Sequence, residues 1–174
     1  MSAPSPMRWS AKETFSSVAV SAHDPAAVLE YARKLKSLQS SLKDDLLIVM
    51  RIFLDEPTGG AGYWSGAMYD PDLDGSFQIN KGFRQARQLL LDVARLGMPV
   101  GCLYCDTISP QFVADLVSWS CISSYAVQSH LHRELASGLS TPVSLACFFT
   151  CRTSHMFSYC LVLPVCPPRW VSSP

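Results

Sequence analysis

The sequence predicts an α/β fold in which a parallel sheet is built from about four to five βα units. Short apolar runs with the character of strands alternate with stretches of helical period along residues 16–145. The run 46–54 is almost continuously apolar, which is typical of a strand buried on both faces of a parallel sheet. Two helices are expected to begin with a capping residue followed by proline, at Asp24-Pro25 and at Ser109-Pro110.

The first unit consists of a β-branched run at 16–20 and a helix that begins at Pro25. Asp24 precedes the proline and is placed to cap this helix. One face of the helix carries apolar residues at helical spacing, namely Val28, Ala32, Leu35, Leu38 and Leu42. The strand expected at 46–54 follows directly.

A long segment separates the second strand from the next helix. Residues 55–78 contain five glycines, two prolines and four aspartates, which together predict a loop. A loop of this length inside a compact domain is usually functional or disordered. The next helix is expected at 79–96, because Gly97 is placed to end it and Pro99 prevents it from resuming.

The later units are shorter. We expect a strand at 100–104, a helix at 109–119, a strand at 121–127, a helix at 130–137 and a fifth strand that begins at 142–145. Repeated βα units of this length predict a parallel sheet with right-handed crossovers. They correspond to half of a (β/α)8 barrel, and a doubly wound open sheet is the alternative. Periodicity alone does not choose between the two.

Composition argues against a nucleic-acid-binding or membrane protein. The 14 basic side chains balance the 14 acidic ones, so the chain has no basic excess to attract nucleic acid. Residues 1–10 lack the apolar core of a secretory signal, and the apolar stretch near the C-terminus is interrupted by Arg152, His155 and Pro164. We therefore expect a cytoplasmic protein whose seven cysteines are reduced.

The chain is expected to have three parts: a disordered N-terminus at 1–15, a partial barrel domain at 16–145, and an irregular tail at 146–174. The tail contains no acidic residue and no glycine, and it does not continue the βα rhythm. Its cysteine spacing, C-x3-C-x8-C-x5-C, is not a standard zinc pattern, so we expect no metal site there. We interpret the tail as non-homologous sequence that arises from a retained intron or a frameshift.

Three blocks of sequence resemble the DAHP synthases (3-deoxy-D-arabino-heptulosonate 7-phosphate synthases) of the microbial, metal-dependent class I type. The first is SAHDPAAVLEYARKL; the second is DDLLIVMRIF, continued after the loop by DPDLDGSFQINKGFRQARQLLLDVARLGMPVG; the third is DTISPQFVADLVSW, followed by HLHRELASGLSTPV. The resemblance implies a TIM barrel, here partial. It also implies an aldol-type condensation of phosphoenolpyruvate with erythrose 4-phosphate at the entry to the shikimate pathway, assisted by a divalent metal (Mn, Co, Fe or Zn).

The resemblance also implies where the site residues lie, and most of these positions have changed. Val20 stands where the family has a metal-binding cysteine, and valine has no lone pair to donate to a metal. Glu56 and Thr58 align with the lysine and arginine of a substrate-gripping Lys-Pro-Arg-Thr-Thr motif. A carboxylate at position 56 would repel a phosphate. No metal site is therefore expected here, and the catalytic residue stays unassigned, with Glu56 at the position of the family lysine.

Three further family positions have lost their charge. Leu103 stands in place of a glutamate, Tyr125 in place of an arginine that holds the substrate phosphate, and Ala146 in place of a phosphate-binding lysine. Arg51 matches a family arginine that helps to hold phosphoenolpyruvate, so it is the candidate substrate-binding residue. The alternative is a structural arginine paired with an aspartate such as Asp106.

These substitutions lead us to expect a DAHP synthase by ancestry, or a paralogue in secondary metabolism, whose chain is itself weakly active or inactive. One alternative is a non-catalytic partner of a full-length DAHP synthase, and another is a decayed gene product. A half barrel leaves one face and two edges of its sheet uncovered, so we expect a homo-oligomer or a complex with a paralogue. His23 and Asp24 are better explained as a helix cap and its neighbour than as an acid–base pair.

Overall fold

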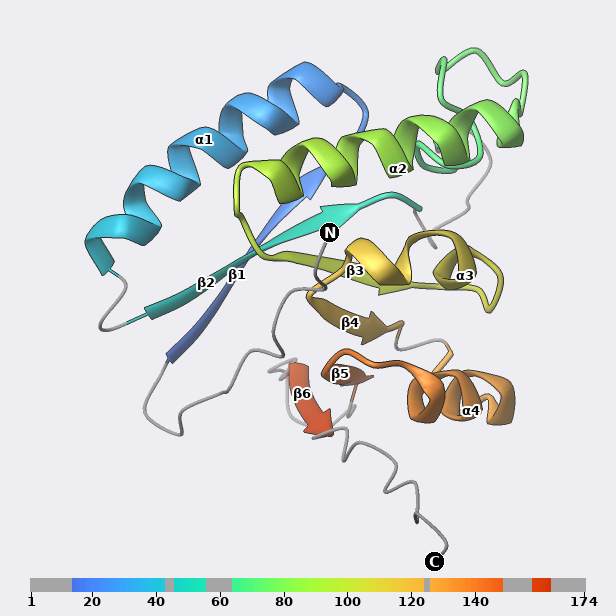
Figure 1. The fold of residues 1–174 in the computed structure, drawn as a ribbon. Helices are drawn as coiled ribbons and strands as arrows, with labels where there is room; N and C mark the ends of the chain where they lie inside the picture. The colour runs from blue at the N-terminus through green and yellow to red at the C-terminus, as the bar shows by residue number, and fades with distance from the viewer. Residues whose placement is uncertain (1–13, 43–45, 56–63, 124–125, 149–157, 164–174) are drawn as a thin grey trace, which may run out of the picture.

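The structure, a computed structural model, describes residues 14–42, 46–55, 64–123, 126–148 and 158–163, with side chains for those between 22 and 145. Within these residues, strands and helices alternate along the chain (Figure 1). The strands are β1 (Thr14–Ser21), β2 (Leu46–Phe53), β3 (Val100–Tyr104), β4 (Trp119–Ile122), β5 (Val143–Phe148) and β6 (Ser158–Leu163). The helices are α1 (Pro25–Leu42), α2 (Ile79–Arg95), α3 (Ser109–Val113), the 3-10 helix η1 (Ala114–Leu116) and α4 (His130–Gly138).

The strand order decides between the two predicted architectures. The strands lie side by side in chain order, β1-β2-β3-β4-β5-β6, and β1 to β5 are parallel. A doubly wound sheet reverses its strand order at a switch point, whereas a barrel adds each strand next to the preceding one. The order is therefore that of a (β/α)8 barrel, and among the described strands the barrel is not closed.

The hydrophobic core lies between the sheet and the helices. Met50, Ile52 and Leu54 on β2 and just beyond it are at most 2% exposed and pack in one cluster with residues of α1 and α2 such as Val28 and Leu90. Successive side chains of a strand point to opposite faces. Val49, Arg51 and Phe53 therefore face the side of the sheet that becomes the interior of a barrel.

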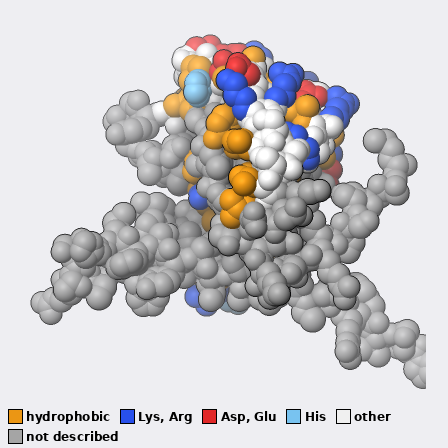
Figure 2. Space-filling view, turned by 90° about the vertical axis from the view of Figure 1, so that its left-hand side faces the viewer, with side chains coloured by type: hydrophobic (Ala, Val, Ile, Leu, Met, Phe, Trp, Pro, Cys, Tyr) orange, Lys and Arg blue, Asp and Glu red, His pale blue; other side chains and the backbone are white. Residues whose placement is uncertain are grey.

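The two long helices agree with the sequence prediction because their signals are local. The Asp24 carboxylate accepts a hydrogen bond from the Ala26 N–H at 2.9 Å, which confirms Asp24 as the cap of α1. α2 begins at Ile79 as predicted and is followed by Gly97, whose φ of 70° suits glycine. Figure 2 shows charged side chains gathered over part of the surface. On α1, Lys34 and Glu30 form an exposed ion pair.

The prediction for residues 109–127 was wrong in its boundaries. Helical structure ends at Leu116, and Val117 has an extended backbone with ψ of 133°. The Ser118 N–H then donates to the Val100 carbonyl, and Trp119 pairs with Gly101, so the strand begins before the predicted residue 121. Strand pairing overrides the local helical pattern here, and a turn at 126–128 replaces the predicted end of the strand.

The tail contains one element that was not predicted. β6 runs antiparallel to β5, with Ser144 opposite Val162 and Ala146 opposite Cys160. The run SYCLVL is apolar and partly β-branched, which favours a strand even though it falls outside the βα rhythm. None of the described helices is long and apolar enough to cross a membrane.

Candidate functional site

The carboxyl ends of the parallel strands meet at one edge of the sheet, which is where (β/α)8 proteins place their active sites. Backbone hydrogen bonds fix this edge. The Ala22 N–H donates to the Phe53 carbonyl at 3.2 Å, and the Met68 N–H donates to the Leu54 carbonyl at 3.1 Å. The second of these bonds holds the loop before α2 against the end of β2 (Figure 1).

Arg51 lies on β2 between Ala19 of β1 and Gly101 of β3. Its guanidinium stacks on the Phe53 ring, with the carbon 4.7 Å from the ring centroid. Its Nε is buried and has no hydrogen-bond partner. No ion pair between Arg51 and Asp106 is seen among the described residues, where other groups hold the Asp106 carboxylate.

Those groups come from two elements. The Tyr69 hydroxyl donates to Asp106 Oδ2 at 3.2 Å, and the Ser109 N–H donates to Oδ1 at 3.1 Å. The Ser109 hydroxyl also donates to Oδ1. Asp106 therefore caps the start of α3, a role that the sequence analysis gave to the Ser109-Pro110 pair. Burial and the neighbouring Asp106 carboxylate raise the pKa of the Tyr69 hydroxyl.

Asp55 follows β2 and is the most unusual charged residue at this edge. It is 4% exposed, and neither carboxylate oxygen has a hydrogen bond of ordinary geometry. Burial raises the pKa of Asp55 to about 6; the Cys105 thiol works against this rise, and the Asp106 carboxylate adds to it. Burial and then the Asp55 carboxylate raise the pKa of the Cys105 thiol. Burial thus shifts both Asp55 and Cys105 towards their protonated forms, and at neutral pH the thiol is protonated while the carboxyl is still largely ionised.

His132 and His23 both make contacts that hold elements of the fold together. His132 of α4 lies 3.2 Å through Nε2 from the Cys105 carbonyl, while its Nδ1 is buried without a partner. This contact ties α4 to the end of β3 and agrees with a packing role for the HLHRELASGLS block. The His23 ring meets the Trp64 ring edge to face at 6.4 Å, and among the described residues the Asp24 carboxylate binds the Ala26 N–H rather than His23.

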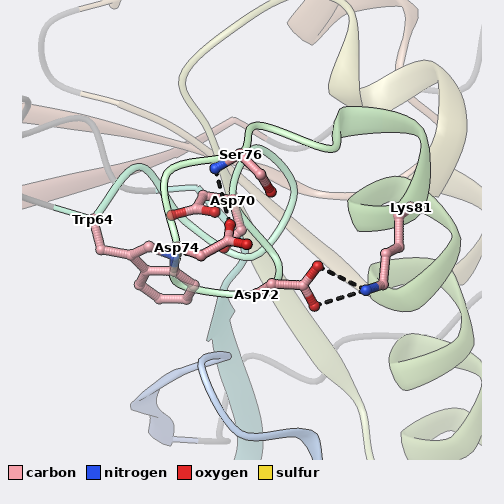
Figure 3. A network of polar contacts seen from close by, with 6 residues as sticks. All are labelled: Trp64, Asp70, Asp72, Asp74, Ser76 and Lys81. Carbon is pink, nitrogen blue, oxygen red and sulfur yellow. Dashed lines mark hydrogen bonds and ion pairs between the residues drawn. The ribbon is translucent and has the colours of Figure 1, made fainter.

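The loop before α2 is ordered by its own aspartates (Figure 3). Asp70 is 6% exposed, accepts the Gly75 N–H on Oδ2 at 3.1 Å, and accepts the Trp64 indole N–H on its backbone carbonyl at 2.7 Å. The Asp74 carboxylate accepts the Ser76 N–H at 2.9 Å, and Lys81 binds both oxygens of Asp72 at 2.7 Å. These contacts shape the segment that lies over the strand ends.

The structure places only some of the site positions that the sequence analysis named. Val20 lies near the end of β1, opposite Ile52. Leu103 lies on β3 and is 9% exposed, and Ala146 lies on β5. Glu56, Thr58 and Tyr125 fall outside the described residues, as do Cys151, His155 and Cys166 of the tail. Among the positions to which the resemblance assigns a role, Arg51 is therefore the charged one whose surroundings the described residues show.

The described residues do not fit the divalent metal that the resemblance implies. Val20 occupies the position of the metal-binding cysteine and offers no donor atom. Within the described part of the chain, no group of three or more His, Cys, Asp or Glu residues is arranged to hold a metal ion. No step of a reaction is therefore assigned to a metal here.

Comparison with known proteins identifies the ancestry of this fold. The sequence profile of the DAHP synthetase I family matches residues 19–147. The chain belongs to this family. A relative from Escherichia coli K12, a Phe-sensitive phospho-2-dehydro-3-deoxyheptonate aldolase, is 50% identical over 123 residues, which cover 71% of this chain and 35% of the relative. A relative of the same enzyme name from Amycolatopsis methanolica is 48% identical over 114 residues, or 66% of this chain and 56% of the relative.

Solved structures agree with this assignment to the DAHP synthetase I family. The phospho-2-dehydro-3-deoxyheptonate aldolase of Francisella tularensis SCHU S4 matches with a TM-score of 0.72 and 43% identity, over 77% of this chain and 39% of that protein. The chain thus spans roughly a third to a half of the length of these relatives.

The sequence analysis missed Asp55, Tyr69 and Cys105 at the strand ends. A signal for Asp55 was present, since it is an acidic residue directly after an apolar strand, where parallel α/β folds gather functional groups. Nothing in the sequence shows that its carboxylate is left without a partner, because that depends on which side chains α3 and the loop place beside it.

Proposed function

We propose that the protein derives from an enzyme that condenses phosphoenolpyruvate with erythrose 4-phosphate at the entry to the aromatic pathway, and that this chain performs the reaction slowly or not at all. Membership of the DAHP synthetase I family and the names of its relatives support the ancestry. The main support for low activity is the charge of the sheet: of the described strands, only β2 carries a charged residue, Arg51.

Two phosphorylated substrates carry several negative charges, and an enzyme that joins them needs fixed cations and hydrogen-bond donors in place. The positions that resemblance assigns to such groups hold Glu56, Thr58, Tyr125 and Ala146. Removal of a single stabilising donor costs on the order of 10²–10³ in turnover. Loss at several positions therefore supports a rate far below that of a complete site.

The test is the consumption of phosphoenolpyruvate by the purified 174-residue chain with erythrose 4-phosphate and Mn²⁺ or Co²⁺. The Escherichia coli relative, assayed in the same buffer, is the positive control. We expect a rate at least 10⁴-fold lower for this chain, in keeping with the loss of two or more such donors. A rate within tenfold of the control would overturn the proposal.

A second candidate function is that of a non-catalytic partner for a second copy or for a full-length paralogue. The observation that favours it is the edge of the sheet, because β1 pairs with β2 alone among the described strands. An unpaired edge presents free N–H and C=O groups that another strand can bind. Co-expression with a paralogue, followed by light scattering of the purified product, tests this; a monomer that does not co-purify would exclude it.

A further inference from the structure

Four buried apolar side chains of the sheet lie apart from the hydrophobic core. They are Val49 on β2, Leu103 on β3, and Trp119 and Cys121 on β4. Each is at most 9% exposed, yet none belongs to the cluster that the sheet forms with the helices. Neighbouring strand residues such as Met50 and Ile122 do belong to that cluster, so alternation puts the four on the opposite face of the sheet. We call these four residues the inner-face patch.

The inner-face patch is continuous across the strands. Leu103 lies directly opposite Cys121, and Trp119 lies opposite Gly101. A Cβ at Gly101 would lie 3.4 Å from the Val49 Cγ1 atom, so Val49 packs beside the glycine. The Trp119 indole N–H donates to the Ser144 hydroxyl at 3.2 Å, which extends the contact to β5.

The burial of the inner-face patch requires a layer on top of it. Side chains that stand on one face of a sheet shield each other's flanks, but their tops stay open to water unless another element packs on them. The helices α1 to α4 all contribute residues to the cluster on the other face. The inner-face patch is buried within a single chain, so the cover belongs to the chain itself rather than to a second copy.

The position of Trp119 limits which segment can provide this cover. Trp119 is the first residue of β4, so it lies near the amino-end edge of the sheet. Residues 56–63 and 149–157 follow β2 and β5, at the carboxyl-end edge. The terminal segments 1–13 and 164–174 adjoin the amino-end edge instead, because β1 begins there and the antiparallel β6 ends there.

Residues 164–174 begin close to Trp119. Leu163, the last residue of β6, lies opposite Val143, and Val143 lies opposite Ser120, the neighbour of Trp119. Two strand spacings of about 4.8 Å therefore separate β6 from β4, or about 10 Å in all. Residues 164–174, extended at about 3.3 Å each, reach about 35 Å, which is enough to cross β5, β4 and β3.

The composition of residues 164–174 suits an apolar surface. The segment PVCPPRWVSSP has no acidic residue, and Arg169 is its one charged side chain. Its prolines have no N–H group, so fewer donors lack a partner when the segment lies on side chains instead of in water. Residues 1–13 carry Arg8, Lys12 and Glu13, which are costly to cover an apolar face with.

We infer that residues 164–174 pack on the inner-face patch, with Trp170 against it, and take the place of the opposite wall of a closed barrel. The open sheet then has an apolar layer on each face, the helices on one and the C-terminal segment on the other. The inference concerns the packing of the chain and does not depend on the proposed function.

Thiol labelling tests this cover, because one cysteine lies on each face of the sheet. Cys121 belongs to the inner-face patch, and Cys102 on the neighbouring strand faces the helices. The full chain is treated with N-ethylmaleimide under native conditions, and peptide mass spectrometry gives the labelling rate of each cysteine. Trp170→Ser removes the largest apolar side chain of the segment and should raise the rate at Cys121 at least threefold, with no change at Cys102.

Trp9→Ser is the matched control, since Trp9 is the aromatic residue of segment 1–13. It should leave the labelling of Cys121 unchanged. A rise in Trp9→Ser but not in Trp170→Ser would assign the cover to the N-terminal segment and overturn the inference. A Cys121 rate in the parent chain that falls as protein concentration increases would also overturn it, because a second copy would then supply the cover.

Deletion of residues 164–174 should have a larger effect, at least tenfold at Cys121, with the Cys102 rate and the circular-dichroism spectrum close to those of the parent. An equal rise at both cysteines means that the truncated chain has unfolded, and Trp170→Ser in the full chain then decides. A Cys121 rate that is unchanged in Trp170→Ser overturns the inference.

Discussion

The Tyr69 hydroxyl donates a hydrogen bond to the Asp106 carboxylate at 3.2 Å, and this contact joins the loop before α2 to the end of β3. The two residues are 37 positions apart, so the bond closes a long segment of chain over the strand ends. Asp106 also caps α3 through Ser109. One carboxylate therefore sets the position of the loop and of the helix that follows β3.

Tyr69→Phe removes the loop side of this contact and should lower the free energy of unfolding by about 1 kcal/mol, the typical net value of one hydrogen bond. The loss stays small because Asp106 keeps its bonds to Ser109. Urea denaturation measures the change. Tyr31→Phe on α1 is the matched control, since no hydrogen bond of the Tyr31 hydroxyl is seen in the described structure. Equal losses in the two variants would contradict a role for the Tyr69–Asp106 contact.

Gly82 is required by the close approach of α2 to the loop before it. A Cβ at this position would lie 2.1 Å from the Met68 carbonyl oxygen and 2.8 Å from that of Ala67, both of them backbone atoms that cannot turn aside. Gly82→Ala should therefore lower stability by at least about 2 kcal/mol, although alanine favours helices. Gly138→Ala on α4 is the control, because nothing lies within 4 Å of its Cβ position. A thermal melt of Gly82→Ala that matches the parent would contradict this packing.

Local signals account for what the sequence predicts well. The start of α1 depends on Asp24 and Pro25, which are adjacent in the chain, and the end of α2 is likewise marked by the nearby Gly97. The start of β4 depends instead on Trp119 pairing with Gly101, a contact between segments that are distant in sequence.

The residues of the candidate site also differ in whether a local sequence signal or a long-range contact determines their surroundings. Arg51 was found from the sequence because a family motif surrounds it. The isolation of its Nε and of the Asp55 carboxylate follows from three-dimensional packing, and no pattern of neighbouring residues encodes it. The absence of an Arg51–Asp106 ion pair among the described residues shows the same limit, since sequence offers the charges but not the partners that Asp106 finds in Tyr69 and Ser109.

The ion pair between Arg87 of α2 and Asp115 of η1 should contribute little despite its good geometry. Both Asp115 oxygens accept from the guanidinium at 2.7 Å, and this bond raises the pKa of Arg87 and lowers that of Asp115. The side chains are 43% and 59% exposed, so water and salt screen the attraction. Asp115→Asn should cost less than about 1 kcal/mol, and the difference should vanish in 1 M NaCl. A larger loss that persists in high salt would show that the pair is effectively buried.

Asp55 should make stability fall as pH rises. Its pKa is raised from 3.8 to about 6 in the folded protein, so the folded state holds this proton more tightly than the unfolded chain does. The resulting stabilisation is present at low pH and is lost between about pH 4 and pH 6. For a pKa shift of this size, the free energy of unfolding falls by about 3 kcal/mol across that range. Asp55→Asn stays neutral and should remove this loss.

A buried amide in Asp55→Asn has donors and acceptors that need partners, so the substitution changes the free energy of unfolding at every pH. The quantity to compare is therefore the slope of the free energy of unfolding against pH. Urea denaturation of the parent and of Asp55→Asn between pH 4 and pH 7.5 measures that slope. Glu134→Gln makes the same charge change at an exposed site on α4 and should follow the parent. If Asp55→Asn also follows the parent, the Asp55 carboxyl is solvated or paired in solution, and burial does not raise its pKa.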